Sequence, residues 1–346
     1  MYDIVFFYSS INRGGSELAL LRYLKNTNKL KEYNAILVYF KDTSDIKMID
    51  EFKKVIEVKK LNDGENIKTK TAVNCMISTT ENGFFNKILA NKYILWVQVN
   101  PKVYSNYKDF DKYDSFLTTS NFIKGMVLEY TGIENKTIYL ANPIVDTKEV
   151  LEKSKEYQDI LNDNDTNIIT IARVTHEKGY DYIIELAKRL KQRNIKFKWY
   201  MLGFISEKEK EYYSSIMKII EENNLKDNII FMGAHENPYK YLKHAYLNVL
   251  LSKGEAWGLA VTEAKILRIP SIASNNTALK EQIEDGINGY LVDLPEKDSD
   301  YEIITDKIQK LIEDKNIYNN MVNNLQNYEI NLNNIIRETD KCFFEW

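Results

Sequence analysis

Short apolar runs alternate along this chain with polar loops and with longer stretches of helical periodicity, and the series begins twice. The runs at 3–8, 35–40 and 93–99 predict buried strands in the first half. After the charged stretch 148–165, an apolar run at 167–172 starts the second series. Strands that alternate with helices form parallel sheets whose ligands bind beyond the carboxyl ends of the strands. The alternation therefore predicts two doubly wound α/β domains, each with a cleft at that edge.

The chain length of 346 residues is long for one hydrophobic core and comfortable for two. The segment 141–146 follows the last expected strand of the first series, and we place the domain boundary there. We predict a first domain over 1–143 and a second over 144–327, which ends in one long helix over 301–327.

Several shorter segments carry simple local patterns. We expect a polar loop over 62–71, a strand over 72–78, a short helix over 84–90 and a charged helix over 206–224. Ser120 precedes an apolar helical pattern, and its hydroxyl is therefore expected to cap the amino end of that helix.

The composition is that of a soluble globular protein, with 44% hydrophobic and 28% charged residues. A net charge of −3 gives no electrostatic footprint for nucleic acid. The start of the chain lacks the basic region of a signal peptide, and no apolar run approaches the ~18–20 residues of a membrane span. Cys75 and Cys342 show neither metal-ligand nor CxxC spacing. We therefore expect a cytosolic protein without a disulfide framework.

The charge is unevenly divided between the two halves. Residues 1–143 contain 20 Lys and Arg against 16 Asp and Glu, about +4, which leaves 27 against 34, about −7, for the rest. This asymmetry suggests that the first half meets an anionic surface such as a cytoplasmic leaflet, and the local lysines that suggest it are Lys53, Lys54, Lys59 and Lys60. Ordinary scatter in composition is the alternative interpretation.

The stretch 246–270 contains the pattern that most clearly indicates a ligand-binding site. An apolar run ends in a polar break, after which a helix is expected to open near Glu255 and to run to about Arg268. Seven residues separate Glu255 from Glu263, so the spacing predicts that both carboxylates lie near one helical face. The amides around Gly258 would lie in a first helical turn, which attracts phosphate. A sugar joined to a nucleotide through a diphosphate needs such contacts, although two glutamates at this spacing are also common as solvated surface charges.

Two other loops follow expected strands and precede helices. Arg173 and Lys178 bracket one of them, and a guanidinium with an ammonium suits a diphosphate. Gly14 and Gly15 lie in the first such loop of the chain, where a helix start can bind phosphate or sugar. A solvated cationic pair and a simple turn are the respective alternatives. No expected strand is followed by GxGxxG, which argues against an NAD-dependent dehydrogenase.

These motifs resemble those of a known family. The run 254–274, continued by 285–292, is similar to the E-x7-E and E-x-I-x-D-G-x-N-G signatures of retaining glycosyltransferases of family four, which have the GT-B fold. The segment 172–181 resembles that family's G-R-L-x-x-x-K-G-x-D motif, and 14–17 resembles its G-G-x-E motif. The resemblance covers nearly the whole chain; it is strong over 170–184 and 250–292 and looser before Pro143.

The resemblance implies the architecture. A GT-B protein has two Rossmann-like domains that face each other across a cleft, and its terminal helix crosses back onto the first domain. We therefore expect the chain from about Tyr328 to residue 346 to form such a helix.

The resemblance also implies the roles of individual residues. Glu263 would hold the ribose hydroxyls and Glu255 the sugar hydroxyls, while Arg173 and Lys178 would bind the diphosphate and neutralise it as it leaves. Glu255, Arg173 and Lys178 form the expected catalytic group. The full expected donor set is Gly14, Gly15, Arg173, Lys178, Gly203, Ala234, Glu255, Ala256, Trp257, Gly258, Leu259 and Glu263. Gln98 and Asn100 are expected on the acceptor side; Gln98 stands where many relatives carry a histidine and cannot act as an acid or base.

The implied activity is transfer of a hexosyl or N-acetylhexosaminyl group from a nucleotide diphosphate-sugar, with UDP as the default nucleotide, to a hydroxyl of a glycan or lipid-linked glycan. The implied setting is cell-envelope polysaccharide synthesis at the inner face of a membrane. Catalysis would rest on positioning and on stabilisation of the departing diphosphate. We expect no required metal, because Asp163 and Asp165 lie in a polar linker and not directly after a strand. A non-catalytic GT-B subunit and a nucleotide-sugar epimerase are the alternatives.

Overall fold

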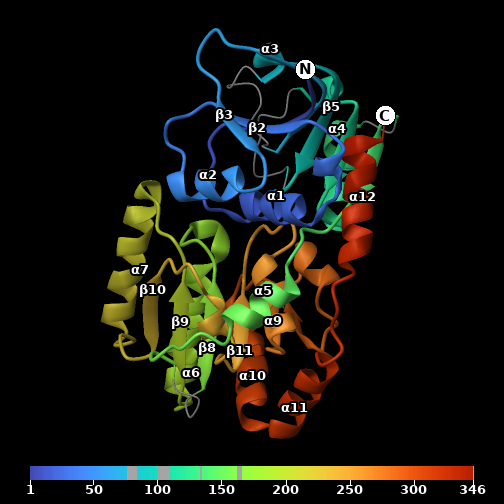
Figure 1. The fold of residues 1–346 in the computed structure, drawn as a ribbon. Helices are drawn as coiled ribbons and strands as arrows, with labels where there is room; N and C mark the ends of the chain where they lie inside the picture. The colour runs from blue at the N-terminus through green and yellow to red at the C-terminus, as the bar shows by residue number, and fades with distance from the viewer. Residues whose placement is uncertain (76–83, 100, 102–108, 133–134, 162–165, 346) are drawn as a thin grey trace. The chain divides into compact units, whose positions relative to one another are not determined.

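The computed structural model describes residues 1–346 except 76–83, 100, 102–108, 133–134, 162–165 and 346. The chain divides into two compact units (Figure 1). Unit 1 contains Met1–Val145 and Asn331–Trp346, and unit 2 contains Asp146–Ile330. The first boundary between the units therefore lies two residues after Pro143, where the sequence places the end of the first domain. The terminal segment of unit 1 begins three residues after Tyr328, where the sequence places the start of the terminal helix.

Unit 1 is built on a parallel sheet of seven strands in the order β3-β2-β1-β4-β5-β6-β7. Its strands are β1 (Tyr2–Tyr8), β2 (Ala35–Tyr39), β3 (Glu57–Lys60), β4 (Ile67–Asn74), β5 (Ile88–Val97), β6 (Ser115–Thr118) and β7 (Thr137–Leu140). Its connecting helices are α1 (Gly15–Asn26), α2 (Ile46–Lys53), α3 (Phe84–Lys87) and α4 (Asn121–Thr131). The predicted cap of α4 is confirmed, because the Ser120 hydroxyl accepts a hydrogen bond from the Ile123 amide at 3.1 Å.

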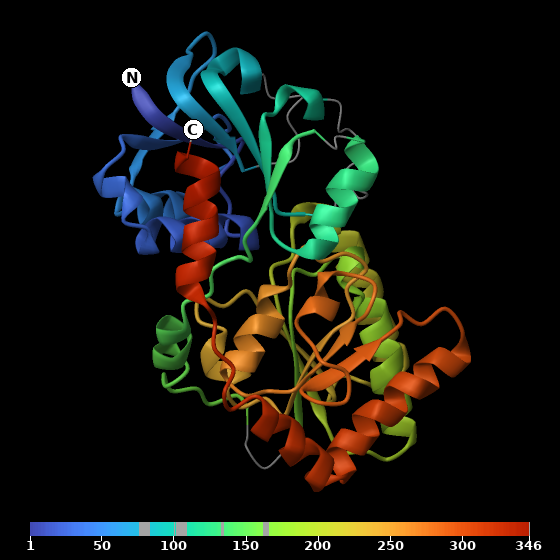
Figure 2. The same ribbon diagram turned by 90° about the vertical axis from the view of Figure 1, so that its right-hand side faces the viewer.

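The last helix of the chain, α12 (Leu332–Phe344), packs against unit 1 (Figures 1 and 2). Its buried positions Ile335, Thr339 and Phe343 recur at intervals of four residues and form one face of the helix. The Phe343 ring lies 5.5 Å from that of Phe6 and 5.7 Å from that of Trp96, as measured between ring centroids. The terminal helix therefore completes the core of the first domain, although it follows the second domain in sequence.

Unit 2 is built on a parallel sheet of six strands in the order β10-β9-β8-β11-β12-β13. Its strands are β8 (Asn167–Ile171), β9 (Lys198–Leu202), β10 (Ile229–Gly233), β11 (Leu247–Leu250), β12 (Ser271–Ser274) and β13 (Gly289–Val292). Its helices are α5 (Thr147–Lys153), α6 (Tyr180–Gln192), α7 (Lys210–Glu222), α8 (Tyr239–Leu242), α9 (Leu259–Ile266), α10 (Asp298–Glu313) and α11 (Lys315–Asn324). The strand order reverses between β8 and β11, which makes their carboxyl ends the switch point of this sheet.

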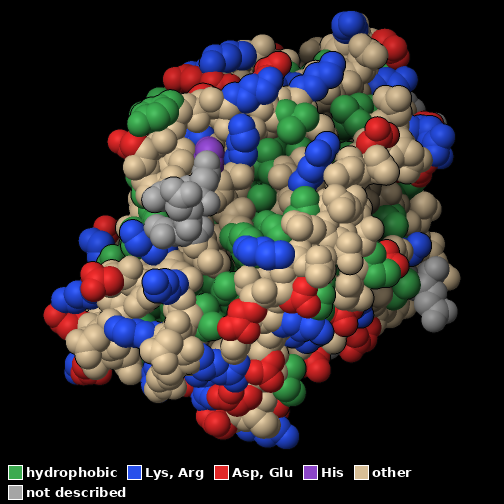
Figure 3. All heavy atoms as spheres, turned by 90° about the horizontal axis from the view of Figure 1, so that it is seen from below, with side chains coloured by type: hydrophobic (Ala, Val, Ile, Leu, Met, Phe, Trp, Pro, Cys, Tyr) green, Lys and Arg blue, Asp and Glu red, His purple; other side chains and the backbone are tan. Residues whose placement is uncertain are grey.

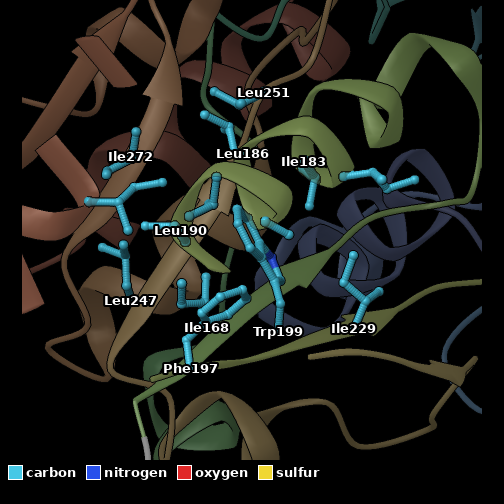
Figure 4. Packing of buried hydrophobic residues seen from close by; sticks show 14 of the residues in the cluster. Ile168, Ile183, Leu186, Leu190, Phe197, Trp199, Ile229, Leu247, Leu251 and Ile272 are labelled. Atoms are coloured by element: carbon cyan, nitrogen blue, oxygen red, sulfur yellow. The ribbon is translucent and has the colours of Figure 1, made fainter. Parts of the chain in front are cut away.

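A buried cluster of aliphatic and aromatic side chains joins α6 to the unit 2 sheet (Figure 4). Trp199 lies at its centre among Ile168, Leu186 and Leu247. The indole N–H of Trp199 donates to the Thr170 hydroxyl at 3.0 Å, so the largest side chain of the core buries no unpaired donor. This core supports the loops that leave the carboxyl ends of β8 and β11.

Ion pairs connect α6 to α10 on the surface of unit 2. Arg189 pairs with Glu185, Asp298 and Glu302, and Arg193 pairs with Glu302 and with Asp306 at 2.7 Å. Both arginines bind Glu302, so these pairs form a network, which contributes more than isolated exposed pairs do. On the face shown in Figure 3, acidic and basic side chains are likewise interspersed.

Two predictions about unit 1 are wrong in detail. The loop expected over 62–71 ends early, because β4 begins at Ile67. The helix expected over 84–90 ends at Lys87, because Ile88 already pairs with Ile67 in the sheet. Of the strand expected over 72–78, residues up to Asn74 belong to β4, and the part from residue 76 lies outside the described residues.

Two predictions about unit 2 are also wrong in detail. The single helix expected over 301–327 is broken at Asp314, whose backbone is extended and whose carboxylate accepts from the amides of Asn316 and Ile317 at 3.0 and 3.2 Å. Asp314 thus ends α10 and caps α11. The helix expected over 206–224 is shorter, because α7 begins at Lys210 after a 3-10 turn over Glu207–Glu209.

The packing of α12 leads to a test. Replacing Phe343 with Ala should lower the free energy of unfolding of unit 1 by about 3–5 kcal/mol, because it empties an aromatic site in a buried core. Urea denaturation followed by near-ultraviolet circular dichroism would measure the loss. Asn333→Ala, at an exposed position of the same helix, is the matched control. Equal stability of the two variants would contradict the assignment of α12 to this core.

Candidate functional site

Two loops meet at the switch point of the unit 2 sheet. The first follows β8 and the second follows β11, and these strands pair with each other, with Leu247 opposite Ile168. The loops are also bonded directly, since the Lys253 amide donates to the Glu177 carbonyl at 2.7 Å. The sequence-predicted residues Arg173, Lys178 and Glu255 all lie in this pair of loops.

A largely buried ion pair joins the two loops. The Lys178 ammonium lies 2.7 Å from Oε1 of Glu255 and donates to the Gly254 carbonyl at 3.4 Å. The side chains of the pair are only 11% and 14% exposed. Charges removed from water to this extent are costly unless they are paired and hydrogen-bonded. The stability of each of these two charges therefore depends on the other.

A glycine allows the loops to come this close. Gly179 has a left-handed backbone, with φ of +67°, and a Cβ atom at this position would lie 2.1 Å from the Leu251 carbonyl oxygen. No other residue type fits here without moving one of the loops. The Lys-Gly pair of the motif thus supplies both the cation and the space that lets it reach Glu255.

The placement of Glu255 differs from the prediction. α9 begins at Leu259, and Gly258 precedes it with φ of +87°, so Glu255 lies in the loop and not on the helix. The left-handed turn at Gly258 separates the two glutamates structurally. Glu255 faces Lys178 because of the loop path, and the expected shared helical face does not form.

Glu263 lies within α9 and is 7% exposed. Its Oε1 accepts a hydrogen bond from the Tyr239 hydroxyl at 3.0 Å. Tyr239 begins the short helix α8. A buried carboxylate with a hydroxyl donor is fixed in orientation, so Tyr239 belongs with the site residues that the sequence reasoning missed.

Arg173 follows β8 and is exposed. Within the part of the chain that the structure describes, its side chain makes no hydrogen bond or ion pair. Gly203 follows β9 beside it: a Cβ on Gly203 would lie 1.7 Å from the Ala172 carbonyl oxygen. Ala234 follows β10, and the Gly203 amide donates to the Gly233 carbonyl at 2.9 Å. The ends of β8, β9 and β10 therefore bring these three predicted residues to one edge of the sheet.

The predicted residues of the first domain lie in unit 1. Gly14 and Gly15 stand at the start of α1, where Glu17 accepts from the Asn12 amide at 3.1 Å and from the Ser16 hydroxyl at 2.6 Å. Glu17, the acidic residue of the G-G-x-E run, thus holds the glycine loop. Gln98 follows β5 and is half-buried. Asn100 lies outside the described residues.

The lysines that suggested a membrane contact are paired. Each of the four contacts a carboxylate, in the pairs Lys53–Asp50, Lys54–Glu51, Lys59–Glu65 and Lys60–Asp42. Their local charge is therefore balanced. No helix of the described residues combines the length and apolar character needed to cross a membrane. Within those residues there is also no cluster of three or more His, Cys, Asp or Glu side chains that could hold a metal ion.

Comparison with protein families decides the assignment. The profile of the family described as Glycosyl transferases group 1 matches residues 152–328, a little over half of the chain. The chain belongs to this family. The match includes both loops of the site, with Arg173, Lys178, Glu255 and Glu263.

Two curated relatives illustrate the similarity. An uncharacterized glycosyltransferase of Methanocaldococcus jannaschii is 29% identical over 201 residues, which cover 53% of this chain and 48% of that protein. The poly(ribitol-phosphate) alpha-N-acetylglucosaminyltransferase of Staphylococcus aureus is 33% identical over 124 residues, which cover 36% of this chain and 24% of that protein. The chain thus spans about half or less of the length of these relatives.

A solved structure extends the comparison to the whole chain. Anabaena Alr3699/HepE, in complex with UDP and glucose, matches with a TM-score of 0.81 at 15% identity, and the match covers 99% of each chain. The structural neighbours of this chain are GT-B glycosyltransferases, so the predicted fold class is confirmed. Membership of family four and a retaining mechanism stay predictions.

The Lys178–Glu255 pair can be tested by comparing the stability of two single variants with that of the double variant. Lys178→Met or Glu255→Leu alone should lower the free energy of unfolding by roughly 3 kcal/mol, because each leaves a buried charge without its partner. The double variant should recover most of this loss. Thermal and urea denaturation of the four proteins would give the coupling energy. Additive single effects would show that the pair is not coupled.

The burial of Lys265, on α9, should make the free energy of unfolding depend on pH. Burial lowers the pKa of Lys265 from 10.5 to about 8. The folded protein therefore binds fewer protons than the unfolded chain between these values, and the Lys265 contribution to the free energy of unfolding rises from about pH 8 to about pH 10.5. Below pH 8 this contribution is constant. Lys265→Met should remove this rise in the free energy of unfolding. Urea denaturation of both proteins at pH 7.5, 8.5 and 9.5 would measure it. If the free energies of unfolding of the two proteins change in parallel with pH, the pKa of Lys265 is not lowered.

Proposed function

We propose that this protein transfers a sugar from a nucleotide diphosphate-sugar to a hydroxyl group of a glycan. The observation that carries the proposal is the buried Lys178–Glu255 pair at the switch point of unit 2, in a chain that belongs to the glycosyl transferases group 1 family. This edge of a doubly wound sheet is where such folds bind their ligands. The similarity to HepE, which was solved with UDP and glucose, supports UDP as the donor nucleotide.

The cations of the site suit the diphosphate. Arg173 is exposed and makes no ion pair within the described residues, so its planar guanidinium can receive two phosphate oxygens. Lys178 adds a compact charge that Glu255 already holds in place. The amides that begin α9 at Leu259 offer a third, uncharged anion contact. These groups would stabilise the negative charge that develops as the diphosphate departs.

The two glutamates suit the hydroxyl groups of the donor. Glu255 uses Oε1 for Lys178, which leaves Oε2 for a sugar hydroxyl. Glu263 is oriented by Tyr239 and would accept from the ribose hydroxyls. In the reaction the bond between the anomeric carbon and the diphosphate oxygen breaks, and its electron pair stays on that oxygen. The acceptor hydroxyl oxygen forms the new bond to the anomeric carbon and passes its proton to the departing diphosphate oxygen.

The finer assignments rest on the family resemblance. We propose a retaining, metal-independent hexosyl- or N-acetylhexosaminyltransferase that acts in cell-envelope polysaccharide synthesis on the cytoplasmic side of the membrane. The name of the Staphylococcus aureus relative, which describes transfer of N-acetylglucosamine to a polymer, supports this class of product. We also propose acceptor contacts for Gln98 and Asn100, as the family resemblance implies. Activity that persists in excess EDTA would support metal independence.

The first test is nucleotide binding. A thermal-shift screen against UDP, GDP, ADP and CMP, followed by the matching nucleotide-sugars, should show a selective shift with one nucleotide, because a ligand at ~100 times its dissociation constant adds ~2.7 kcal/mol to stability. Transfer and hydrolysis assays with that donor then test the reaction. Binding without turnover would favour a non-catalytic subunit, and folded protein that binds none of these nucleotides would refute the proposal.

The site assignment within this function is tested by Arg173→Ala. Loss of a charged hydrogen-bonding group should weaken nucleotide diphosphate binding by about tenfold or more in isothermal titration calorimetry. Lys196→Ala removes the same charge near the opposite edge of the same sheet, just before β9, and should leave the affinity unchanged. Equal affinity of the two variants would show that Arg173 does not contact the diphosphate.

A further inference from the structure

The turn between Glu255 and α9 is held from behind by one short segment of unit 2. This segment comprises the 3-10 turn η6 (Ala278–Glu281) and the residue after it, Gln282. The Ala278 amide donates to the Glu255 carbonyl at 3.3 Å. The Gln282 side-chain amide donates to the Trp257 carbonyl and, at 3.2 Å, to the Gly258 carbonyl. Three carbonyls of the turn are thus directed into the protein.

Gln282 also closes a ring of hydrogen bonds. The indole N–H of Trp257 donates to the Thr262 hydroxyl at 3.0 Å, and that hydroxyl donates its only proton to Oε1 of Gln282 at 2.7 Å. Nε2 of Gln282 returns to the Trp257 carbonyl. Each member donates to the next, so the direction of every hydrogen bond is fixed. The side chain and the backbone of Trp257 are therefore held by the same ring.

The surroundings allow little relaxation of this ring. Gln282 is 4% exposed, and its own carbonyl accepts from the buried ammonium of Lys265 at 2.6 Å. A Cβ atom on Gly258 would lie 2.3 Å from Leu279 of η6, so the turn is packed directly against this segment. A buried carbonyl that loses its donor must find another partner or be exposed to water. Without Gln282 the turn would have to move.

We propose that Gln282 is a positioning residue of the donor site: through the Trp257–Gly258 turn, it sets the loop that carries Glu255 and the amide groups that begin α9 before the donor arrives. This inference rests on the proposed function, which assigns that loop to the nucleotide diphosphate-sugar. Gln282 itself is buried and contacts the turn. Its effect on the ligand is pre-organisation, because a turn held in one conformation loses less freedom on binding.

The first readout is the mobility of the turn in the ligand-free protein. In Gln282→Met, which keeps the length of the side chain and removes its hydrogen bonds, amide hydrogen exchange over residues 255–262 should be about tenfold faster. Gln158→Met is the matched control. Gln158 holds another loop of unit 2 through three hydrogen bonds, to Ile160 and Leu161. This control should leave exchange over 255–262 unchanged.

The second readout is affinity, measured well below the melting point so that all variants are folded. UDP should bind Gln282→Met about tenfold more weakly than it binds the parent, while Gln158→Met should equal the parent. In the transfer assay the donor KM should rise by the same factor. If Gln282→Met does not fold, Thr262→Val breaks the same ring with a smaller change in shape and should shift both readouts in the same direction.

The outcomes separate this inference from the function it rests on. Faster exchange together with weaker UDP binding supports the positioning role. Unchanged exchange over 255–262, or an affinity equal to that of Gln158→Met, overturns it while the proposed function stands. A parent protein that binds no nucleotide overturns the proposed function, and the positioning role falls with it.

Discussion

The close approach of two loops at the switch point of unit 2 is the constraint on which the site depends. β8 and β11 lie side by side because the strand order reverses there, and Gly179 lets the loop after β8 contact the end of β11 at Leu251. A side chain at Gly179 would separate Lys178 from Glu255. The electrostatics of the site therefore follow from a backbone constraint, and the motif glycine is as necessary as the charged residues beside it.

The buried ion pair is a feature that stability alone would not favour. An apolar pair of similar volume in place of Lys178 and Glu255 would recover most of the stability that the ion pair provides, because two charges need not leave water. Proteins retain such strained or costly groups where function needs them. The pair also balances the charge of Lys178 against that of Glu255, whereas Arg173 is exposed and makes no ion pair within the described residues.

The fold class, the two sheets and the positions of the charged loops after β8 and β11 could be predicted from the sequence. These features depend on local patterns: apolar runs, glycine turns and motif spacing. The sequence prediction misplaced Glu255, since the pattern E-x7-E does not show that Gly258 adopts a left-handed turn. The sequence predicted one helix in place of α10 and α11, since Asp314 can lie within a helix or cap one. Tyr239 and Gln282 were missed because their contacts join residues about 20 positions apart in sequence, and only packing brings them together.

The two glutamates of the motif show the difference between what local sequence patterns predict and what only packing brings together. Glu255 is held by an ion pair from the neighbouring loop, and Glu263 by a tyrosine hydroxyl from α8. Both contacts are made to Oε1, one from an ammonium that balances the charge and one from a neutral hydroxyl that does not. Glu255 and Glu263 belong to one short run of sequence and can be found from its spacing. Tyr239 holds Glu263 from 24 positions away, so this contact is found only from the structure.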